Sequence, residues 1–564
     1  MAIQISGSTV IHDSQDVQVS GMFTASSFVG DASQLTNLPA SGGTLEATAS
    51  GTLADGSTVI INTDGTVSVV ELSGSLSPNV GSSAEHLNNQ SQNFATAFIP
   101  PTNQVAIVFK DSNGYGQSVV GTVSGSSITF GTATVFISSN RFRTFGMDYD
   151  ATTNNIILHY GITGTSSSDW SGSAHILSAK VDGNSLNWTT GLPGGTYGYE
   201  YYGNYTKCGD MDVLEDLSES FGSTSGFFLA IARRDQGYSQ AEHHMRFFEI
   251  NAAGDSITNH GSIDIVTLTA GGHVRSTPNI IADGANNRFF AIYTNNSHEG
   301  AVKVGTITPA TNPFDSPSIA FNGSEVIFET GSTNTNYAQF QSPEQFASAY
   351  DPHHNRLVIM YKDVGDSNKT KLVVGTPSAT SISFGSPQDF SPTNVDSFDM
   401  VFDSKINKII ISYRDLTDSN KGKIVKSEVS NTGNSITVES SRLEFDSSNS
   451  DNYQNKLAYD TNSHKTIISH FSNGSYTSRS VVYSPTSQTS NLTEGNFIGI
   501  SNGAYTNGQT ATIQVVGSVD DAQVGLTTGK SYYVQDDGTL STSADFPSVL
   551  AGTSVDSTKL IVKG

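Results

Sequence analysis

The sequence has almost no cysteine and no long apolar run. Cys208 is the single cysteine among 564 residues, which excludes an intrachain disulfide and a zinc site built from cysteines. No stretch reaches the roughly 20 consecutive apolar residues that span a bilayer, so we expect no membrane insertion. The first residues, MAIQISGSTVIHDSQ, lack the charged and apolar regions of a secretory signal, and we expect a soluble product made in the cytoplasm.

Basic residues are also scarce. The chain has 28 Lys and Arg against 52 Asp and Glu, giving a net charge of -24. Phosphate binding depends on clustered Lys and Arg side chains that release counterions. The basic residues here are scattered, so nucleic acid is excluded as a partner. The acidity fits an exposed particle protein that must stay soluble.

The abundant residues favour many short strands. Charged residues make up 14% of the chain and hydrophobic ones 36%, while Gly, Ser, Thr and Asn fill much of the remainder. This composition suits strands joined by turns and disfavours long helices. The length is sufficient for more than one domain with a large core.

One repeat unit organises most of the chain. Its best copy is Phe346 to Phe390, FASAYDPHHNRLVIMYKDVGDSNKTKLVVGTPSATSISFGSPQDF. The unit alternates four β-rich runs with polar turns, which predicts four antiparallel strands. Four strands in about 45 residues are typical of one propeller blade.

Further copies align by register and predict seven blades. Phe94–Asp111 and Phe398–Asp415 align on Phe346–Asp363 without a gap. Weaker copies lie at Phe145–Tyr160, Phe227–Asp235, Asp283–Tyr293 and Tyr459–Phe471. The predicted fold class is therefore all-β: a seven-bladed β-propeller flanked by an N-terminal fibrous segment and a small C-terminal β domain.

The segments around the propeller predict four domains. Residues 1–50 are a fibrous segment with too few apolar residues for a core, unless several copies pool them in a homotrimer. Residues 51–90 hold a β-hairpin and linker, 91–485 the propeller and 491–564 a C-terminal β module. The hairpin Gly51–Leu72 belongs either to the layer of Ser531–Thr542 or to the propeller. The last blade lacks a fourth strand, which either Thr66–Val70 or Ser82–Ala95 supplies.

Two terminal segments carry a family resemblance. Ser20–Ala40, SGMFTASSFVGDASQLTNLPA, resembles a signature of phage tail-fibre and related virion proteins, matching at Gly30, Asp31, Ser33, Leu35, Thr36, Asn37, Leu38 and Pro39. Ala32 stands where the signature has a second glycine. Residues 491–564 resemble a small module at the ends of many phage structural proteins. The middle blades are similar to repeats of large β-propeller virion proteins of marine phages. The resemblance implies a virion component that is attached to other virion proteins.

A tyrosine-rich stretch, predicted to be a loop, is the candidate ligand site. Thr196–Tyr205, TYGYEYYGNY, holds five tyrosines in nine residues and follows Trp188. Tyrosine offers a flat apolar face for a sugar ring and a hydroxyl for its polar edge. The stretch contacts either a host polysaccharide or receptor, or a neighbouring subunit. The candidate residues are Tyr197, Tyr199, Tyr201, Tyr202, Tyr205 and Trp188.

Other polar motifs have plain structural interpretations. Asp363, Asp366 and Asn368 recur as Asp415, Asp418 and Asn420, and such oxygens either hold calcium or cap Asx-type turns, of which we favour the turns. The pairs His243-His244 and His353-His354 do not suit a joint metal site, because neighbouring residues of a strand point to opposite faces. We predict no cofactor and no catalytic constellation.

The expected function is that of a phage virion structural protein, a tail fibre or related appendage that contacts the host cell surface. A capsid-decorating fibre or tail-hub component is the alternative within this class. A propeller glycan hydrolase is the alternative from another class, because catalytic carboxylates on separate loops leave no contiguous motif.

Overall fold

The computed structural model describes most of the chain beyond its first 42 residues. The described residues are 43–74, 77–87, 92–138, 142–163, 172–189, 199–202, 206–214, 224–235, 241–268, 278–308, 317–330, 346–447, 455–472, 477–486, 489–493, 495–542, 544 and 548–563. In these ranges the only helical elements are two 3₁₀ turns, η1 (Pro100–Thr102) and η2 (Gly284–Asn286). None of the described helices could span a membrane. The predicted all-β class is confirmed.

Antiparallel sheets follow one another along the middle of the chain, and the described residues form seven of them. The first four sheets comprise β7 (Gln92–Ile99), β8 (Gln104–Lys110), β9 (Gly116–Ser124), β10 (Ser127–Phe130) and β11 (Thr134–Ile137); β12 (Phe142–Asp150), β13 (Asn155–Thr163), β14 (Gly172–Asp182), β15 (Ser185–Trp188) and β16 (Tyr199–Tyr202); β17 (Thr206–Val213), β18 (Gly226–Asp235), β19 (Ala241–Ile250) and β20 (Ile257–Leu268); and β21 (Asn279–Asp283), β22 (Arg288–Thr294), β23 (Gly300–Thr308), β24 (Ser318–Phe321) and β25 (Val326–Glu329). The last three comprise β26 (Phe346–Asp351), β27 (Arg356–Asp363), β28 (Lys369–Pro377), β29 (Ile382–Phe384) and β30 (Gln388–Asp389); β31 (Val395–Asp403), β32 (Lys408–Asp415), β33 (Lys421–Val429) and β34 (Ile436–Asp446); and β35 (Lys456–Asp460), β36 (Lys465–Ser472) and β37 (Thr477–Ser484) with β5 (Asn79–Val80) and β6 (Ala84–Leu87).

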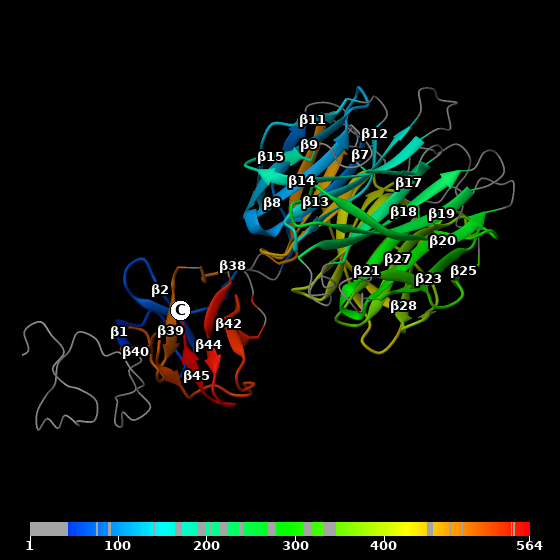
Figure 1. Cartoon of the computed structure of the whole chain (residues 1–564). Coiled ribbons are helices and arrows are strands. Elements are labelled where there is room, and N and C mark those ends of the chain that lie inside the picture. Colours follow the sequence, from blue (N-terminus) through cyan, green and yellow to red (C-terminus); the bar gives the residue numbers. More distant parts are fainter. Residues whose placement is uncertain are drawn as a thin grey trace, which may run out of the picture.

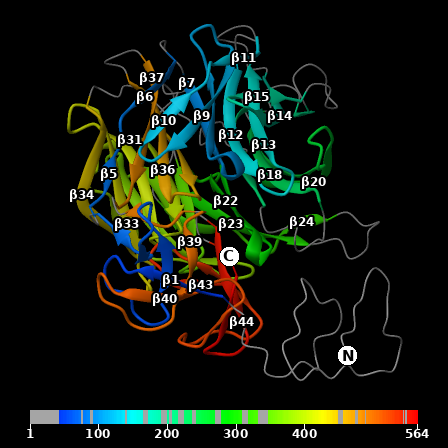
Figure 2. The same cartoon turned by 90° about the vertical axis from the view of Figure 1, so that its left-hand side faces the viewer.

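These sheets are arranged as a propeller. The first strand of each sheet contacts the first strand of the next, in the order β7, β12, β17, β21, β26, β31 and β35. Strand β35 in turn contacts β7, so the last sheet lies beside the first. Figures 1 and 2 show the sheets gathered into one body. Apolar clusters fill the seams between neighbouring sheets.

A recurring turn explains why the blade copies align. Most first strands end in a buried aspartate, and the residue four positions later adopts a left-handed backbone. Asp351 Oδ1, for example, accepts the backbone N–H of His354 at 3.0 Å. Asn tolerates the left-handed conformation better than other non-glycine residues do. The left-handed residues of this turn are Asn103, Asn154, Asn287, Asn355, Asn407 and His464.

The last sheet is completed by residues that precede the first blade. Strands β5 and β6 pair with β37, with Val80 opposite Tyr483 and Leu87 opposite Ser478. Of the two segments predicted to supply the missing strand, Ser82–Ala95 contains β6, and the other, Thr66–Val70, lies elsewhere. Chain segments from both ends of the propeller therefore cover an edge that would otherwise stay unpaired.

Both ends of the chain build a second body, the β module. One sheet has the order β1 (Thr44–Thr48), β40 (Thr510–Gln514), β39 (Phe497–Ser501), β2 (Thr58–Ile61) and β3 (Val67–Val69). The other has the order β41 (Val519–Asp520), β45 (Leu560–Val562), β44 (Val549–Ser554), β42 (Ser531–Val534) and β43 (Leu540–Ser541). The cluster around Ile60, Ile500, Val534 and Leu560 packs the two sheets together.

The β module differs from the predicted division of the chain. The hairpin of Gly51–Leu72 was assigned to a separate 51–90 unit, and the module to 491–564 alone. Strand β2 instead pairs with β39, and Thr58 Oγ1 donates to Gly538 O at 2.8 Å. Neither interpretation of the hairpin holds as stated, because β2 and β3 lie in one sheet of the module and Ser531–Thr542 contributes β42 and β43 to the other. The predicted fibrous segment 1–50 also extends too far, because Thr44–Thr48 is strand β1 of the module and pairs with β40. Sequence spacing carried no sign of this pairing, because the partners lie at opposite ends of the chain.

A two-stranded neck connects the β module to the propeller. Strand β4 (Leu72–Ser73) leads toward the propeller and pairs with β38 (Thr489–Ser490), which returns from it. The Lys405 ammonium of the propeller lies 2.8 Å from Asp536 Oδ1 of the β module. Figure 1 shows the module beside the propeller, with β38 between them. The propeller is thus an insertion between two halves of the β module.

Candidate functional site

The tyrosine-rich stretch forms a strand where the sequence predicted a loop. Residues Tyr199–Tyr202 are β16, which pairs antiparallel with β14 through Tyr202 opposite Ala174 and Tyr199 opposite Ile176. Strand β13 occupies the other side of β14, so β16 lies at the outer edge of its sheet. The alternation of tyrosine with other residues suits an edge strand. Tyr197 and Tyr205 lie outside the described residues.

Trp188 is engaged in packing between two sheets. It lies on β15, opposite Ala179 of β14. Its ring stacks on Phe136 of the first blade sheet at 4.4 Å between centroids and 18° between planes. Its Nε1 donates to Ser118 Oγ at 3.1 Å. Strands β15 and β16 pair with successive parts of β14. The indole of Trp188, however, packs between its own sheet and the first blade sheet.

The matched residues of the virion signature, Gly30, Asp31, Ser33, Leu35, Asn37 and Leu38, lie outside the described residues.

Four carboxylates on the innermost strands form a feature that the sequence reasoning missed. Each accepts a backbone N–H from the next innermost strand, as Asp210 Oδ2 does from Ile280 at 3.0 Å and Asp399 Oδ2 from Leu457 at 2.9 Å. The other two are Asp148, toward Val213, and Asp212, toward Ala282. These strands have one free edge each, and the aspartates satisfy part of it. The sequence signal is an aspartate within a predicted first strand, as in GDMDV at 209–213.

Burial favours the protonated form of two of these carboxyls, Asp210 and Asp148. Burial raises the pKa of Asp210 to about 7, and the Asp399 carboxylate acts in the same direction while Lys456 opposes it. Burial likewise raises the pKa of Asp148 to about 6. A carboxyl that titrates near neutrality can donate or accept a proton. The backbone hydrogen bonds give both groups a structural role that explains their position without chemistry.

The recurring acidic turns hold lysine ammonium groups. Lys371 Nζ lies 2.7 Å from Asp363 Oδ2 and 3.2 Å from Asp366 Oδ2. In the next blade Lys423 Nζ lies 2.9 Å from Asp415 Oδ2 and 2.6 Å from Asp418 Oδ2. Asp363 and Asp415 also accept backbone N–H groups of their own turns, as the Asx-type interpretation expects. In both turns a lysine lies between the carboxylates that were considered for calcium.

The two histidine pairs differ: His243 and His244 belong to strand β19, whereas the rings of His353 and His354 meet edge to face at 4.5 Å between centroids. His244 Nδ1 lies 2.5 Å from Asp264 Oδ1, whereas His243 is buried in the sheet. His354 Nδ1 lies 2.7 Å from Asp351 Oδ2 and belongs to the blade turn described above. Within the described part of the chain, no group of three or more His, Cys, Asp or Glu side chains is placed to hold a metal ion.

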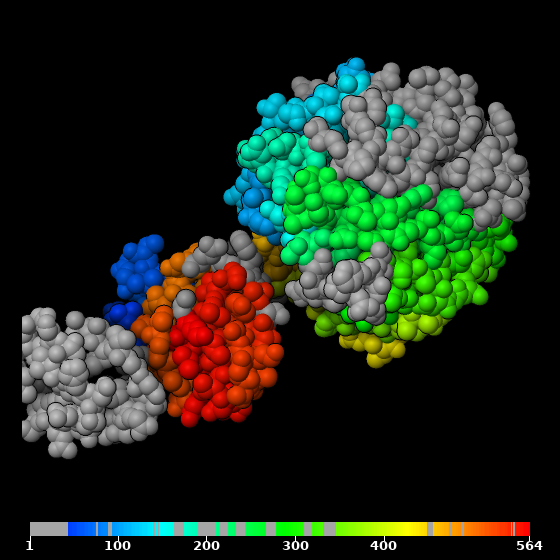
Figure 3. Space-filling view, in the orientation of Figure 1, coloured from blue at the N-terminus to red at the C-terminus, as the bar shows by residue number. Residues whose placement is uncertain are grey.

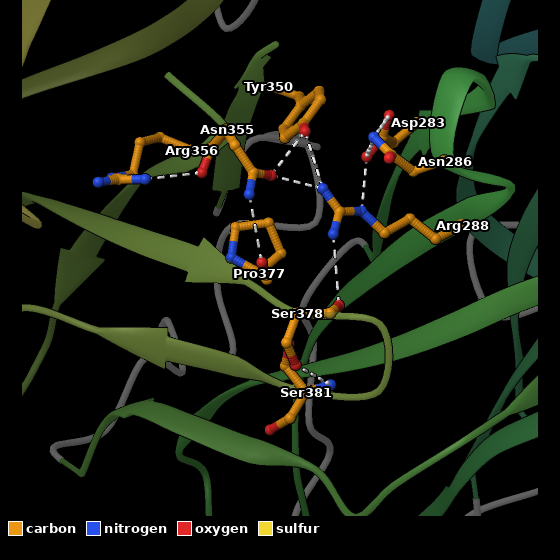
Figure 4. A network of polar contacts seen from close by, with 9 residues as sticks. All are labelled: Asp283, Asn286, Arg288, Tyr350, Asn355, Arg356, Pro377, Ser378 and Ser381. Carbon is orange, nitrogen blue, oxygen red and sulfur yellow. Dashed lines mark hydrogen bonds and ion pairs between the residues drawn. The ribbon is translucent and has the colours of Figure 1, made fainter. Parts of the chain in front are cut away.

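A buried polar network fixes one blade sheet to the next, as Figure 4 shows. Arg288 Nε lies 2.5 Å from Asp283 Oδ2 within its own sheet. Its Nη2 donates to Tyr350 Oη at 2.8 Å and to Asn355 Oδ1 at 2.6 Å, both in the following sheet. Its Nη1 donates to Ser378 O at 3.3 Å. The sequence showed Asn287-Arg288 as a marker of a blade copy but gave no sign of this contact.

Comparison with known proteins gives no relative by sequence. The chain matches no protein-family model, and no curated protein sequence matches it either. Among solved structures, the fucose-specific lectin from Aleuria aurantia is similar with a TM-score of 0.36 and 13% identity, over 63% of this chain and 96% of the lectin. A Bacteroides fragilis protein assigned as a 6-phosphogluconolactonase is similar with a TM-score of 0.40 and 11% identity, over 72% of this chain and 95% of that one. Prolyl oligopeptidase B from Galerina marginata has a TM-score of 0.34 and 12% identity, over 69% of this chain and 46% of the peptidase. None of these likenesses is close enough to carry a function to this chain.

Proposed function

We propose that the chain is a phage virion structural protein, a tail fibre or related appendage whose seven-bladed propeller contacts the host cell surface. The observation that carries the proposal is the neck. Strands β4 and β38 pair with each other, so the propeller has two covalent connections to the β module, and both leave from one place. A propeller that is attached at one place leaves the outer strands of its other blades accessible to a partner. The tail-fibre resemblance of residues 20–40 and the phage-module resemblance of residues 491–564 support the same role.

Each part of the structure has a place in this proposal. Residues 1–42 attach the chain to other virion proteins and bring copies together as a homotrimer, and the β module begins at Gly43. The buried Arg288 network and the turn aspartates make the ring rigid. Rigid scaffolds that present exposed residues bind with a small entropic cost. The chain is made in the host cytoplasm and ends in the virion.

The host-contact surface in this proposal is the rim of the second blade at β16. An edge strand has a neighbouring strand on one side only, and tyrosine carries a flat ring with a hydroxyl. Replacing Tyr199, Tyr201 and Tyr202 together with Ala should weaken binding to host cells by about 1 to 3 kcal/mol. Val135→Ala on β11 is the matched control, because β11 has the equivalent place on the first blade sheet and Val135 is 50% exposed. Binding that is equal for the triple variant and the control would reject the rim as the contact surface.

A glycan hydrolase is the second candidate, and the carboxyls of Asp148 and Asp210 favour it because their pKa values are raised toward neutrality. We propose that they act structurally and that the chain is not an enzyme. Purified protein incubated with host envelope polysaccharide should then release no reducing sugar. Release that is lost in Asp210→Asn would establish the hydrolase instead. A capsid-decorating fibre or tail-hub component differs from a tail fibre only in its location on the particle.

A further inference from the structure

Exposed large apolar side chains are concentrated on the β module. Among the described residues, seven such side chains are exposed, and only Val135 belongs to the propeller. The other six belong to the module's two sheets and their connections: Leu45, Ile61, Val516, Val519, Val524 and Val555. The propeller is the larger body, so size does not explain this distribution. Clustered apolar exposure marks an interaction surface more often than scattered exposure does.

Several of these residues share one face. Val519 on β41 lies directly opposite Ile561 on β45, and Ile561 lies opposite Thr553 on β44. Residues opposite each other in a sheet project from the same side. The alternate residues Leu560 and Val562 are buried in the core between the two sheets. The Val519 side of this sheet is therefore its outer side.

Two further exposed valines lie near the two ends of β45. Val516 precedes Gly517, whose N–H donates to Val562 O at 2.9 Å. Val555 begins the turn that joins β44 to β45, and its N–H donates to Lys559 O at 2.9 Å. Val516, Val519 and Val555 are 61%, 41% and 42% exposed. We call the surface of Val516, Val519, Val555 and Ile561 the valine face.

The valine face lies away from the propeller. Strands β41 and β45 are at one edge of their sheet, whereas β42 and β43 are at the other. The ion pair to the propeller is made by Asp536, which follows β42. In Figure 3 the C-terminal strands, coloured red, are open to view beside the propeller. Another molecule can reach the valine face without displacing the propeller.

The N-terminal segment joins the module beside this face. Gly43 O accepts the N–H of Val515 at 3.1 Å and the hydroxyl of Ser518 at 3.2 Å. The described chain therefore begins beside Val515 and Ser518, the sequence neighbours of Val516 and Val519. The few apolar residues of the segment 1–42 suit burial between chains, and any contact that joins those segments brings the modules together at this end.

The charge distribution also favours another copy of this chain as the partner at the valine face. The chain carries a net charge of -24, which makes copies repel one another over most of their surface. The valine face is itself uncharged and is flanked by the exposed residues Lys559 and Lys563 and by Asp556, whose carboxylate lies 4.0 Å from Lys559 Nζ. Close approach of two copies costs less here than on an acidic surface.

We propose that the valine face is the surface through which other copies of this chain pack against the β module. This inference deepens the proposed function, because it assigns the homotrimer a contact beyond residues 1–50. Each module in a ring of copies would bury its own valine face against a neighbour. The propellers, on the other side of the modules, would stay free.

The test uses the full-length chain and sedimentation equilibrium. Wild-type protein should be a trimer at micromolar concentration, and the double variant V516E/V519E should need about tenfold more protein to assemble, equivalent to about 1.4 kcal/mol. V135E is the matched control and should assemble as wild type does. The milder pair V516S/V519T should weaken assembly in the same direction, which separates a surface effect from a folding defect. Thermal unfolding should be unchanged in all variants at a concentration where each is monomeric, because the replaced side chains are exposed and assembly no longer contributes to stability.

Two results would overturn the inference: a monomeric wild-type chain, or assembly of V516E/V519E that equals assembly of V135E. A monomer that still binds host cells would reject the valine face and leave the proposed function standing. If the protein is absent from virions but its assembly depends on Val516 and Val519, the valine face stands and the proposed function is rejected.

Discussion

The propeller and the β module pair their strands over different distances along the chain. In the propeller each described strand pairs within its own blade, with the next strand along the chain or, for β11, β16, β25 and β30, with the strand before that; only β5 and β6 come from farther away. In the β module, Thr44 lies opposite Gln514 and Thr58 opposite Ile500. The propeller is thus built from local hairpins that repeat. The module exists only when the two ends of the chain meet, and it holds the propeller's entry and exit together.

The seams within the propeller differ as well. The seam between the fourth and fifth blade sheets contains the polar network of Arg288. The seam between the last and first sheets is largely aromatic, with His86 near the rings of Phe94, Phe109 and Phe130. A buried ion pair is costly to break one partner at a time, whereas a buried imidazole responds to pH. The predictions below test these differences.

The largest effect is expected for Arg288→Ala. The variant leaves the Asp283 carboxylate buried without its cation and removes donors to Tyr350 and Asn355. Breaking a buried pair in this way costs about 3 to 5 kcal/mol of unfolding free energy. Urea denaturation followed by tyrosine fluorescence measures this loss. The control Lys369→Ala removes an exposed partner of Asp366 and should change stability much less. Equal losses in the two variants would show that the seam does not depend on the network.

The next effect tests the joined ends of the β module. A Cβ on Gly538 would meet Val70 O at 2.3 Å, and the residue has a φ of +85°. Gly65 has a similar φ of +82°, and a Cβ there would meet nothing within 4 Å. Both Gly→Ala variants lose about 1 kcal/mol for the left-handed backbone. Gly538→Ala should lose about 2 to 3 kcal/mol more, because the clash separates the two halves of the module. Similar melting temperatures for the two variants would contradict the contact between Val70 and Gly538.

A smaller, pH-dependent effect is expected at the closing seam. Burial, and to a lesser extent the charge of His470, lowers the pKa of His86 to about 3. The unfolded chain binds a proton on this residue below about pH 6.5, whereas the folded chain does so only near pH 3. Wild-type stability therefore falls as pH drops from 6.5, by about 1.4 kcal/mol per pH unit from this group.

His86→Phe removes this proton uptake and keeps the seam aromatic. At pH 4.5 the variant should be more stable than wild type by about 2 to 3 kcal/mol relative to their difference at pH 7.5. Denaturation at the two pH values measures the change. A stability difference that is the same at both values would mean that His86 is not held neutral by the seam.

The propeller strands were more predictable from the sequence than the strand pairing of the β module. The blade strands and their turns were predictable, because a buried aspartate and a left-handed Asn recur at a fixed spacing, as at Asp351 and Asn355. The partner of the 51–72 hairpin was left open, since pairing between distant segments leaves no local pattern. The Tyr199–Tyr202 stretch was predicted as a loop, because its flanking glycines resemble turn residues and its pairing with β14 follows a long insertion.

The candidate site was less predictable than the fold. The role of Asp210 depends on the free edge of a strand in the next sheet, and such an edge becomes visible only in three dimensions. Trp188 was grouped with the tyrosines by proximity in sequence, but its ring stacks on Phe136 of another sheet. Side chains that contact the next sheet depend on which blades are neighbours and how they face each other, and an alignment of repeats does not specify this.

The most direct test of the account is to locate the chain on the virus particle. Antibodies raised against the purified protein should label purified particles of the encoding phage by immunogold electron microscopy, at a tail fibre or a related appendage. The account predicts labelling at the outer ends of that appendage, where the propeller rim would meet a host. Particles that carry no label, and whose proteins by mass spectrometry do not include this chain, would contradict it.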